Sequence, residues 1–136
     1  MMQAMNATEV RRHWSEFIDG VVRGRPQAVK RNRDHILAIS LDHARELLNG
    51  VRFTMKVEHE EDGSVTGSLE GLDLVENAPD LESLRRALAK ELLIYSEHYF
   101  AQFPMYFSSP NRRHHFPAVL RVQLAESEDE VMELID

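Results

Sequence analysis

The sequence predicts an α+β protein built from two modules, because helical and strand patterns follow one another along the chain. Apolar residues recur at helical spacing between positions 10 and 22 and between positions 81 and 103, whereas positions 51–57 alternate between apolar and polar. We predict the order β-α-β-β-α for the first module. The second is predicted as β-β-(β)-α-β, a small antiparallel sheet packed on one long helix. The turn-forming pair Asn49-Gly50 marks the boundary between them.

The composition is that of a folded protein. Of 136 residues, 43% are hydrophobic and 29% are charged, which excludes a wholly disordered or collagen-like chain. Cysteine is absent, so the chain has no disulfide framework, thiol nucleophile or thiolate metal site. The N-terminus lacks a signal-peptide core, and no apolar run reaches the about 18 residues of a membrane span. We therefore expect a cytoplasmic protein with no membrane partner.

The net charge of −7 argues at first sight against a nucleic-acid partner, but the charge is unevenly spread. Residues 1–50 carry eight Lys and Arg against six Asp and Glu, a balance of +2. Residues 51–136 carry eight basic and 17 acidic residues, a balance of −9. This asymmetry indicates two halves with different partners.

A short strand and then a helix are expected at the start of the chain. Asn6 can cap the helix through its side-chain oxygen, and Glu9 lies three residues later, as in a capping box. The helix should end near Gly20 or Gly24. The apolar residues that follow the cap share one helical face: Val10, Trp14, Phe17, Ile18, Val21 and Val22.

A hairpin and a second short helix complete the first module. Residues 27–30 and 35–40 are predicted strands, joined by a turn at residues 32–34. Ser40 can then cap a helix that runs to about Leu48.

The first fifty residues offer only a thin core. A domain of ~60 residues already buries only about 60% of its unfolded surface, so such a unit usually needs a partner. We predict that Val10, Trp14, Phe17 and Ile18 form a core shared between two copies in a homodimer or a higher even oligomer. The alternative is that these side chains are buried within a single copy.

The residues from Asn6 to Asp19 resemble the opening helix of the Phd/YefM antitoxins. The matching residues are Thr8, Glu9, Arg11, Ser15, Glu16 and Ile18. Residues 26–31 resemble the family's P-I-x-I-T-R strand, with Arg31 at its arginine, and residues 37–42 resemble its A-V-L-x-S-x-E/D run. The resemblance covers residues 3–48, about a third of the chain.

That resemblance implies a β-α-β-β-α module that dimerises, binds a palindromic operator and represses its own operon together with a toxin. Arg11 and Arg31 match family arginines that lie in or beside the DNA groove. Phosphate neutralisation supplies most of the affinity of such contacts. With their basic neighbours, the predicted DNA-binding residues are Arg11, Arg12, Lys30, Arg31 and Arg33.

The second half begins with strands. Apolar Val51, Phe53, Met55 and Val57 alternate with polar residues. We then predict a turn at residues 60–63, a strand at 64–70, a short strand at 74–75 and a helix from Leu81 to Pro104. We also predict a loop over residues 104–117 and a final strand over residues 118–124. The acidic tail over residues 125–136 is expected to be either a solvated helix or a frayed end.

This second half resembles the HicB antitoxin domain, which has a partial ribonuclease-H-like fold. The matching run is Asp80-Leu81-Glu82-Ser83-Leu84-Arg85-Arg86-Ala87-Leu88, preceded by Glu61-Asp62-Gly63 and Gly71-Leu72. The predicted domains are therefore a dimerisation and DNA-binding domain at 1–50, a partner-binding domain at 51–124 and the acidic tail at 125–136.

Two groups of residues raise the question of enzymatic activity. Carboxylates near strand ends could hold Mg²⁺ as in a nuclease, namely Glu58, Glu60, Glu70, Asp73 and Glu76. His98, His114 and His115 could suggest a metal site, although adjacent histidines on a strand point to opposite faces. The carboxylates do not form a motif of specific spacing and the adjacent histidines make a poor pair, so we predict no catalytic residue, no metal and no cofactor.

These observations lead to one functional hypothesis and one alternative. The chain is predicted to be a type II antitoxin that neutralises a toxin, expected to be a ribonuclease, and that represses its own operon as a DNA-binding dimer. An acidic half suits the basic surface of a ribonuclease. The alternative is a stand-alone DNA-binding regulator whose second half senses a ligand or sets the oligomer, with residues 99–107 lining a pocket.

Overall fold

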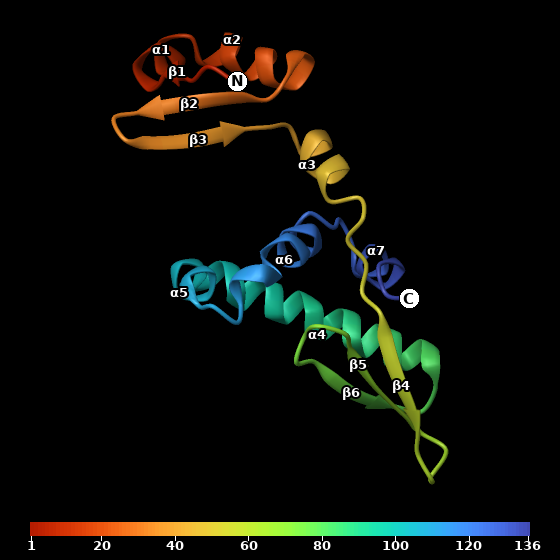
Figure 1. Cartoon of the computed structure of the whole chain (residues 1–136). Helices are drawn as coiled ribbons and strands as arrows, with labels where there is room; N and C mark the ends of the chain where they lie inside the picture. Colours follow the sequence, from red (N-terminus) through yellow and green to blue (C-terminus); the bar gives the residue numbers. More distant parts are fainter. The chain divides into compact units, whose positions relative to one another are not determined.

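The computed structural model describes all 136 residues, which form two compact units, Met1–Leu47 and Leu48–Asp136 (Figure 1). Each unit contains one three-stranded sheet and several helices, so the α+β class predicted from the sequence is confirmed.

The first unit follows the predicted order of strand, helix, hairpin and helix. Strand β1 is parallel to β2, and β2 is antiparallel to β3, so β2 lies at the centre of the sheet. The elements are β1 (Met5–Asn6), α1 (Ala7–Arg12), α2 (Trp14–Asp19), the π-helix η1 (Gly20–Gly24), β2 (Gln27–Arg31), β3 (Asp34–Ala38) and α3 (Leu41–Leu47).

The predicted single helix is divided into three pieces. The Asn6 side chain accepts a hydrogen bond from the backbone N–H of Thr8 at 2.8 Å, which confirms the cap. His13, with φ −121° and ψ 45°, separates α1 from α2, and the last piece ends at Gly24. The small core of the unit consists of Val10, Phe17, Val21 and Val29.

The hairpin and the second helix lie close to the predicted positions. Asn32 has a φ of 53°, a left-handed conformation that asparagine tolerates, so a two-residue turn joins Arg31 to Asp34. Asp34 therefore starts β3 instead of ending the turn. The Ser40 hydroxyl accepts from the His43 N–H at 3.1 Å, while the Ser40 N–H donates to Nδ1 of His43 at 3.2 Å, a reciprocal cap on α3.

The second unit contains an antiparallel sheet of order β4-β5-β6 and a series of helices. The strands are β4 (Met55–His59), β5 (Val65–Leu69) and β6 (Val75–Ala78). The helices are α4 (Leu81–Ala101), α5 (Phe103–Ser108), the 3-10 helix η2 (Arg113–His115), α6 (Phe116–Gln123) and α7 (Glu128–Glu133).

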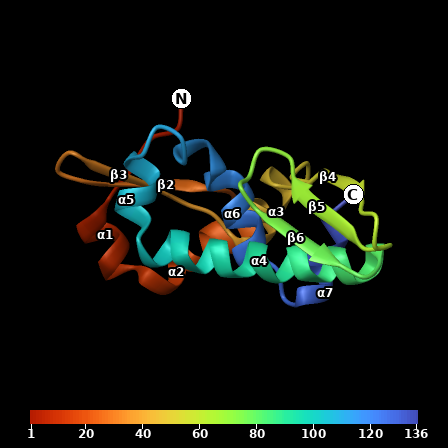
Figure 2. The same cartoon turned by 90° about the horizontal axis from the view of Figure 1, so that it is seen from below.

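The sheet packs against the first half of the long helix α4, as both views show (Figures 1 and 2). Asp80 caps α4 by accepting from the Ser83 N–H at 2.8 Å. Val65 and Leu69 on β5 are buried against the apolar stripe of α4, in which Leu84 and Leu88 are fully buried. The alternation predicted around β4 is also present, because Phe53 is buried while its neighbours Arg52 and Thr54 are exposed.

Residues 116–123 form helix α6, so the predicted final strand is wrong. Part of the predicted loop before it is also helical, since α5 begins at Phe103 and includes Pro104. Proline in the first turn of a helix costs no hydrogen bond, and both α5 and α6 carry one there. The valines that suggested a strand, Val119 and Val122, are three residues apart and are both buried on one helical face.

The acidic C-terminal segment contains helix α7, so the helical alternative is correct, but the segment is packed on the core and is neither solvated nor frayed. Val131 is fully buried, and Leu134 and Ile135 are nearly so. Ile135 bridges to Phe53 in the manner of a parallel strand, and the Asp136 carboxylate accepts from Nε of Arg52 at 2.8 Å. The acidic side chains occupy one side of this segment, while the other side supplies apolar groups to the core.

We expect the substitution Leu134→Ala to lower the free energy of unfolding by about 2 to 4 kcal/mol, because it leaves a cavity in a packed core. The neighbouring Glu133→Ala replaces an exposed side chain and should change stability by less than about 0.5 kcal/mol. Urea unfolding of the full chain, followed by circular dichroism, measures both values. Equal effects of the two substitutions would mean that the segment is solvated.

Candidate nucleic-acid and partner interfaces

The five basic residues predicted to bind DNA are all exposed in the first unit. Arg11 and Arg12 lie at the end of α1, whereas Lys30 and Arg31 lie at the end of β2 and Arg33 lies in the hairpin turn. The two groups are distant in sequence, but the sheet brings them together, because Asn6 at the start of α1 pairs with Lys30 of β2.

Two of these arginines are held by carboxylates of the same unit. Arg12 pairs with Glu9 at 3.3 Å, and Arg31 pairs with Asp34 at 3.2 Å across the hairpin. Exposed ion pairs of this kind contribute about 0 to 1 kcal/mol, so a phosphate group can replace the carboxylate at little cost. Arg11 and Lys30 form no ion pair within the chain.

The hairpin presents its basic residues on two faces. Side chains alternate along a strand, so Arg31 shares a face with Val29 and lies beside α1, in a pocket of about 310 Å³ that Ala7 and Ile36 also line. Lys30 lies on the opposite face, across from His35. The side chain of Arg31 therefore lies on the same face as the start of α1, whereas the side chain of Lys30 points to the other face of the sheet.

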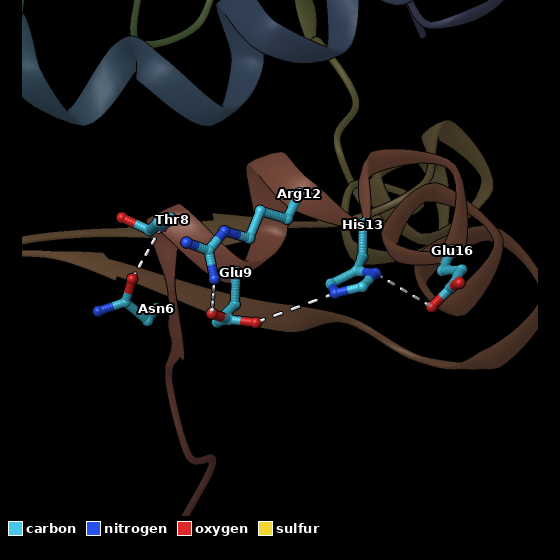
Figure 3. A network of polar contacts seen from close by, with 6 residues as sticks. All are labelled: Asn6, Thr8, Glu9, Arg12, His13 and Glu16. Carbon is cyan, nitrogen blue, oxygen red and sulfur yellow. Dashed lines mark hydrogen bonds and ion pairs between the residues drawn. The ribbon is translucent and has the colours of Figure 1, made fainter.

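A cluster of His13 with two glutamates, which was not predicted from the sequence, lies beside the basic residues. His13 stands between two carboxylates, with Nε2 4.0 Å from Glu9 and Nδ1 3.8 Å from Glu16 (Figure 3). The same Glu9 also holds Arg12, so this part of the helix surface mixes both signs of charge (Figure 3). The spacing of Glu9, His13 and Glu16 by four and three residues is the signal that could have revealed it.

The four residues predicted for a dimer core divide into two pairs. Val10 and Phe17 are buried in the unit's own core. Trp14 and Ile18 remain 56% and 40% exposed, and Val22 extends their row by one further turn. The Trp14 ring stacks on Phe17 with 5.8 Å between ring centroids. The result is an apolar stripe, formed by Trp14, Ile18 and Val22, that the unit itself does not cover.

The carboxylates considered for a nuclease site do not meet in the second unit. No group of three Asp, Glu or His side chains lies close enough to hold a metal ion. His114 and His115 contact each other with ring centroids 4.4 Å apart, because they lie in a 3-10 helix and not in a strand. Glu60, Glu61 and Asp62 gather instead around an open, solvated hollow at the β4–β5 turn.

Comparison with known proteins identifies the family. A family model described as PHD-like, "Antitoxin of toxin-antitoxin, RelE / RelB, TA system", matches residues 1–136. The chain belongs to this antitoxin family. Membership of such a family points to a regulatory protein and not to an enzyme.

A solved structure agrees with this assignment. It is the crystal structure of an antitoxin part of a putative toxin/antitoxin system from Syntrophomonas wolfei subsp. wolfei, which is 38% identical to this antitoxin with a TM-score of 0.94. The match covers 99% of this chain and 97% of the other, so both proteins contain the folded second unit. No curated protein matches the sequence. None of the antitoxin's helices has the length and apolar character needed to cross a bilayer.

Proposed function

We propose that this antitoxin neutralises its toxin with the acidic second unit and represses its own operon in the cytoplasm as a dimer that binds DNA through the first unit. The observation that carries the proposal is the division of charge between the two units. The first unit, residues 1–47, has a net charge of +2, and the second unit, residues 48–136, has a net charge of −9. Operator DNA and a basic ribonuclease toxin require opposite surface charges.

The DNA-binding part of the proposal rests on exposed basic groups that are free or weakly paired. Arg11 makes no ion pair, and the Arg31–Asp34 pair is open to solvent. Two-fold symmetry would double this surface and set the spacing of two operator half-sites.

The double substitution Arg11→Ala with Arg31→Ala should abolish binding at physiological salt to the DNA upstream of the antitoxin's own reading frame. Four phosphate contacts would be lost per dimer, so at low salt, where weak binding is still measurable, the slope of log K against log salt should fall by about 3 to 4. Fluorescence anisotropy across a salt series measures both quantities. Arg23→Ala with Arg25→Ala removes the same charge from the end of η1 and is the matched control. Equal losses in the two variants would reject these residues as the contact site.

The dimerisation part rests on the exposed apolar stripe of Trp14, Ile18 and Val22. The unit's own core contains only four buried apolar side chains besides Ala44, which is small for a unit of 47 residues. A contiguous exposed apolar row marks an interaction surface, and a two-fold contact would let the stripe cover itself.

Ile18→Asp should weaken dimerisation at least about tenfold, because the contact would bury an unpaired carboxylate. Light scattering over a concentration series gives the dissociation constant of the dimer. Met105→Asp changes an exposed apolar residue of the second unit and should leave the dimer intact. A monomeric wild-type chain, or a dimer unaffected by Ile18→Asp, would reject the stripe as the interface.

The toxin-binding part predicts that residues 48–136 alone capture the product of the adjacent reading frame and that residues 1–47 do not. The fragment should fold because it contains its own core of twelve buried apolar residues. Co-purification tests the capture, and inhibition of RNA cleavage by the captured protein tests whether it is a ribonuclease. Capture by residues 1–47 alone, or an affinity that does not fall with salt, would contradict binding through the acidic unit.

A further inference from the structure

A pocket of about 220 Å³ lies in the second unit. Residues 72–74, which connect β5 to β6, form one wall. Tyr95 of α4, Tyr106 of α5 and the pair Arg112 and His115 form the rest. The space would hold roughly seven water-sized groups, the size of a small metabolite.

Arg112 is fixed in this pocket from several directions. Its Nη1 donates to the Tyr95 hydroxyl at 3.1 Å, and its guanidinium carbon lies 5.6 Å from the Tyr95 ring centroid and 5.4 Å from that of Tyr106. The hydroxyl of the fully buried Tyr99 donates to the Arg112 backbone carbonyl at 2.9 Å. Both the backbone and the side chain of Arg112 are therefore positioned by the rigid helix α4.

The charge of Arg112 nevertheless has no ionic partner. The unit has an excess of carboxylates, and Arg52, Arg86 and Arg121 all pair with one. Arg112 forms no ion pair, although Asp73 lies at the pocket and is close enough to favour the charged guanidinium. A guanidinium has five N–H donors, and one of them has a partner in the chain.

The neighbouring imidazole of His115 is hydrogen-bonded to Tyr95. The Tyr95 oxygen lies 2.6 Å from Nδ1 of His115. The Tyr95 oxygen therefore contacts both Arg112 and His115, which joins the three side chains in one hydrogen-bonded group. Burial lowers the pKa of His115 below its ordinary value, and the charges of His114 and Arg112 lower it further.

We propose that this pocket binds the oxyanion group of a small molecule, a carboxylate or a phosphate, on the guanidinium of Arg112. A planar guanidinium held in place with free donors matches the geometry of either group. The tyrosine rings provide flat walls for the remainder of the molecule. Asp73, exposed at the pocket, opposes the oxyanion, so it limits affinity and selects against densely charged anions.

The full chain, labelled with ¹⁵N, can be titrated at constant ionic strength with sodium benzoate and separately with inorganic phosphate. We expect saturable NMR shifts confined to residues 72–74, Tyr95, Tyr106 and 112–115, and the tighter of the two probes identifies the preferred group. Arg112→Gln should weaken that binding at least tenfold. Arg113→Gln removes the adjacent charge, which lies over Phe107 outside the pocket, and should leave the affinity unchanged.

Two further variants separate binding from folding and test the sign of the charge. Arg112→Lys keeps the cation but loses the planar fork, so it should stay folded by circular dichroism and bind severalfold more weakly. Asp73→Asn should tighten binding of either anion, because it removes the opposing charge. Shifts that do not saturate, equal losses in Arg112→Gln and Arg113→Gln, or weaker binding in Asp73→Asn would each overturn the proposal.

Discussion

The second unit depends on the close approach of its sheet to helix α4 at Gly67. A Cβ atom at this position would lie 2.7 Å from Cδ2 of Leu84, a side chain that is fully buried. Only glycine allows the strand to come so near, and this approach lets Val65 and Leu69 bury against the helix. With its first half held by the sheet, α4 carries Tyr95 and Tyr99 toward the other end of the unit. The geometry around Arg112 follows from that placement.

Elements with a long and regular pattern could be predicted from the sequence. Helix α4 repeats its leucines over several turns, and the residues around Phe53 alternate cleanly, so both predictions agree with the structure. Short elements could not be read in the same way. The spacing of Val119 and Val122 suits a helix, but over eight residues the β-branched composition favoured a strand. In α7 the run of acids concealed the apolar side formed by Val131 and Leu134, which became visible only with the tertiary contacts.

Local sequence patterns were also insufficient to predict the candidate surfaces. Helical spacing placed Val10, Trp14, Phe17 and Ile18 on one face, but it could not show which of them the unit buries and which it leaves exposed. Strand alternation could have separated Lys30 from Arg31, because neighbouring residues on a strand point to opposite sides. What no local pattern contains is the parallel pairing of β1 with β2, which brings Arg31 beside the first helix. The pocket at Arg112 likewise joins segments that are about forty residues apart in sequence.

A folded second unit changes what toxin binding requires of this antitoxin. A disordered segment that wraps a toxin loses conformational entropy when it becomes ordered, and that loss reduces the affinity obtained from each contact. Here the acidic half already has a core of twelve buried apolar residues and a C-terminus held at Phe53 and Arg52. A toxin bound by this unit would therefore meet a preformed surface, and the long-range attraction of a −9 unit for a basic protein would act mainly on the rate of association. The net charge of −7 hides this arrangement, because it is the sum of a first half at +2 and a second half at −9.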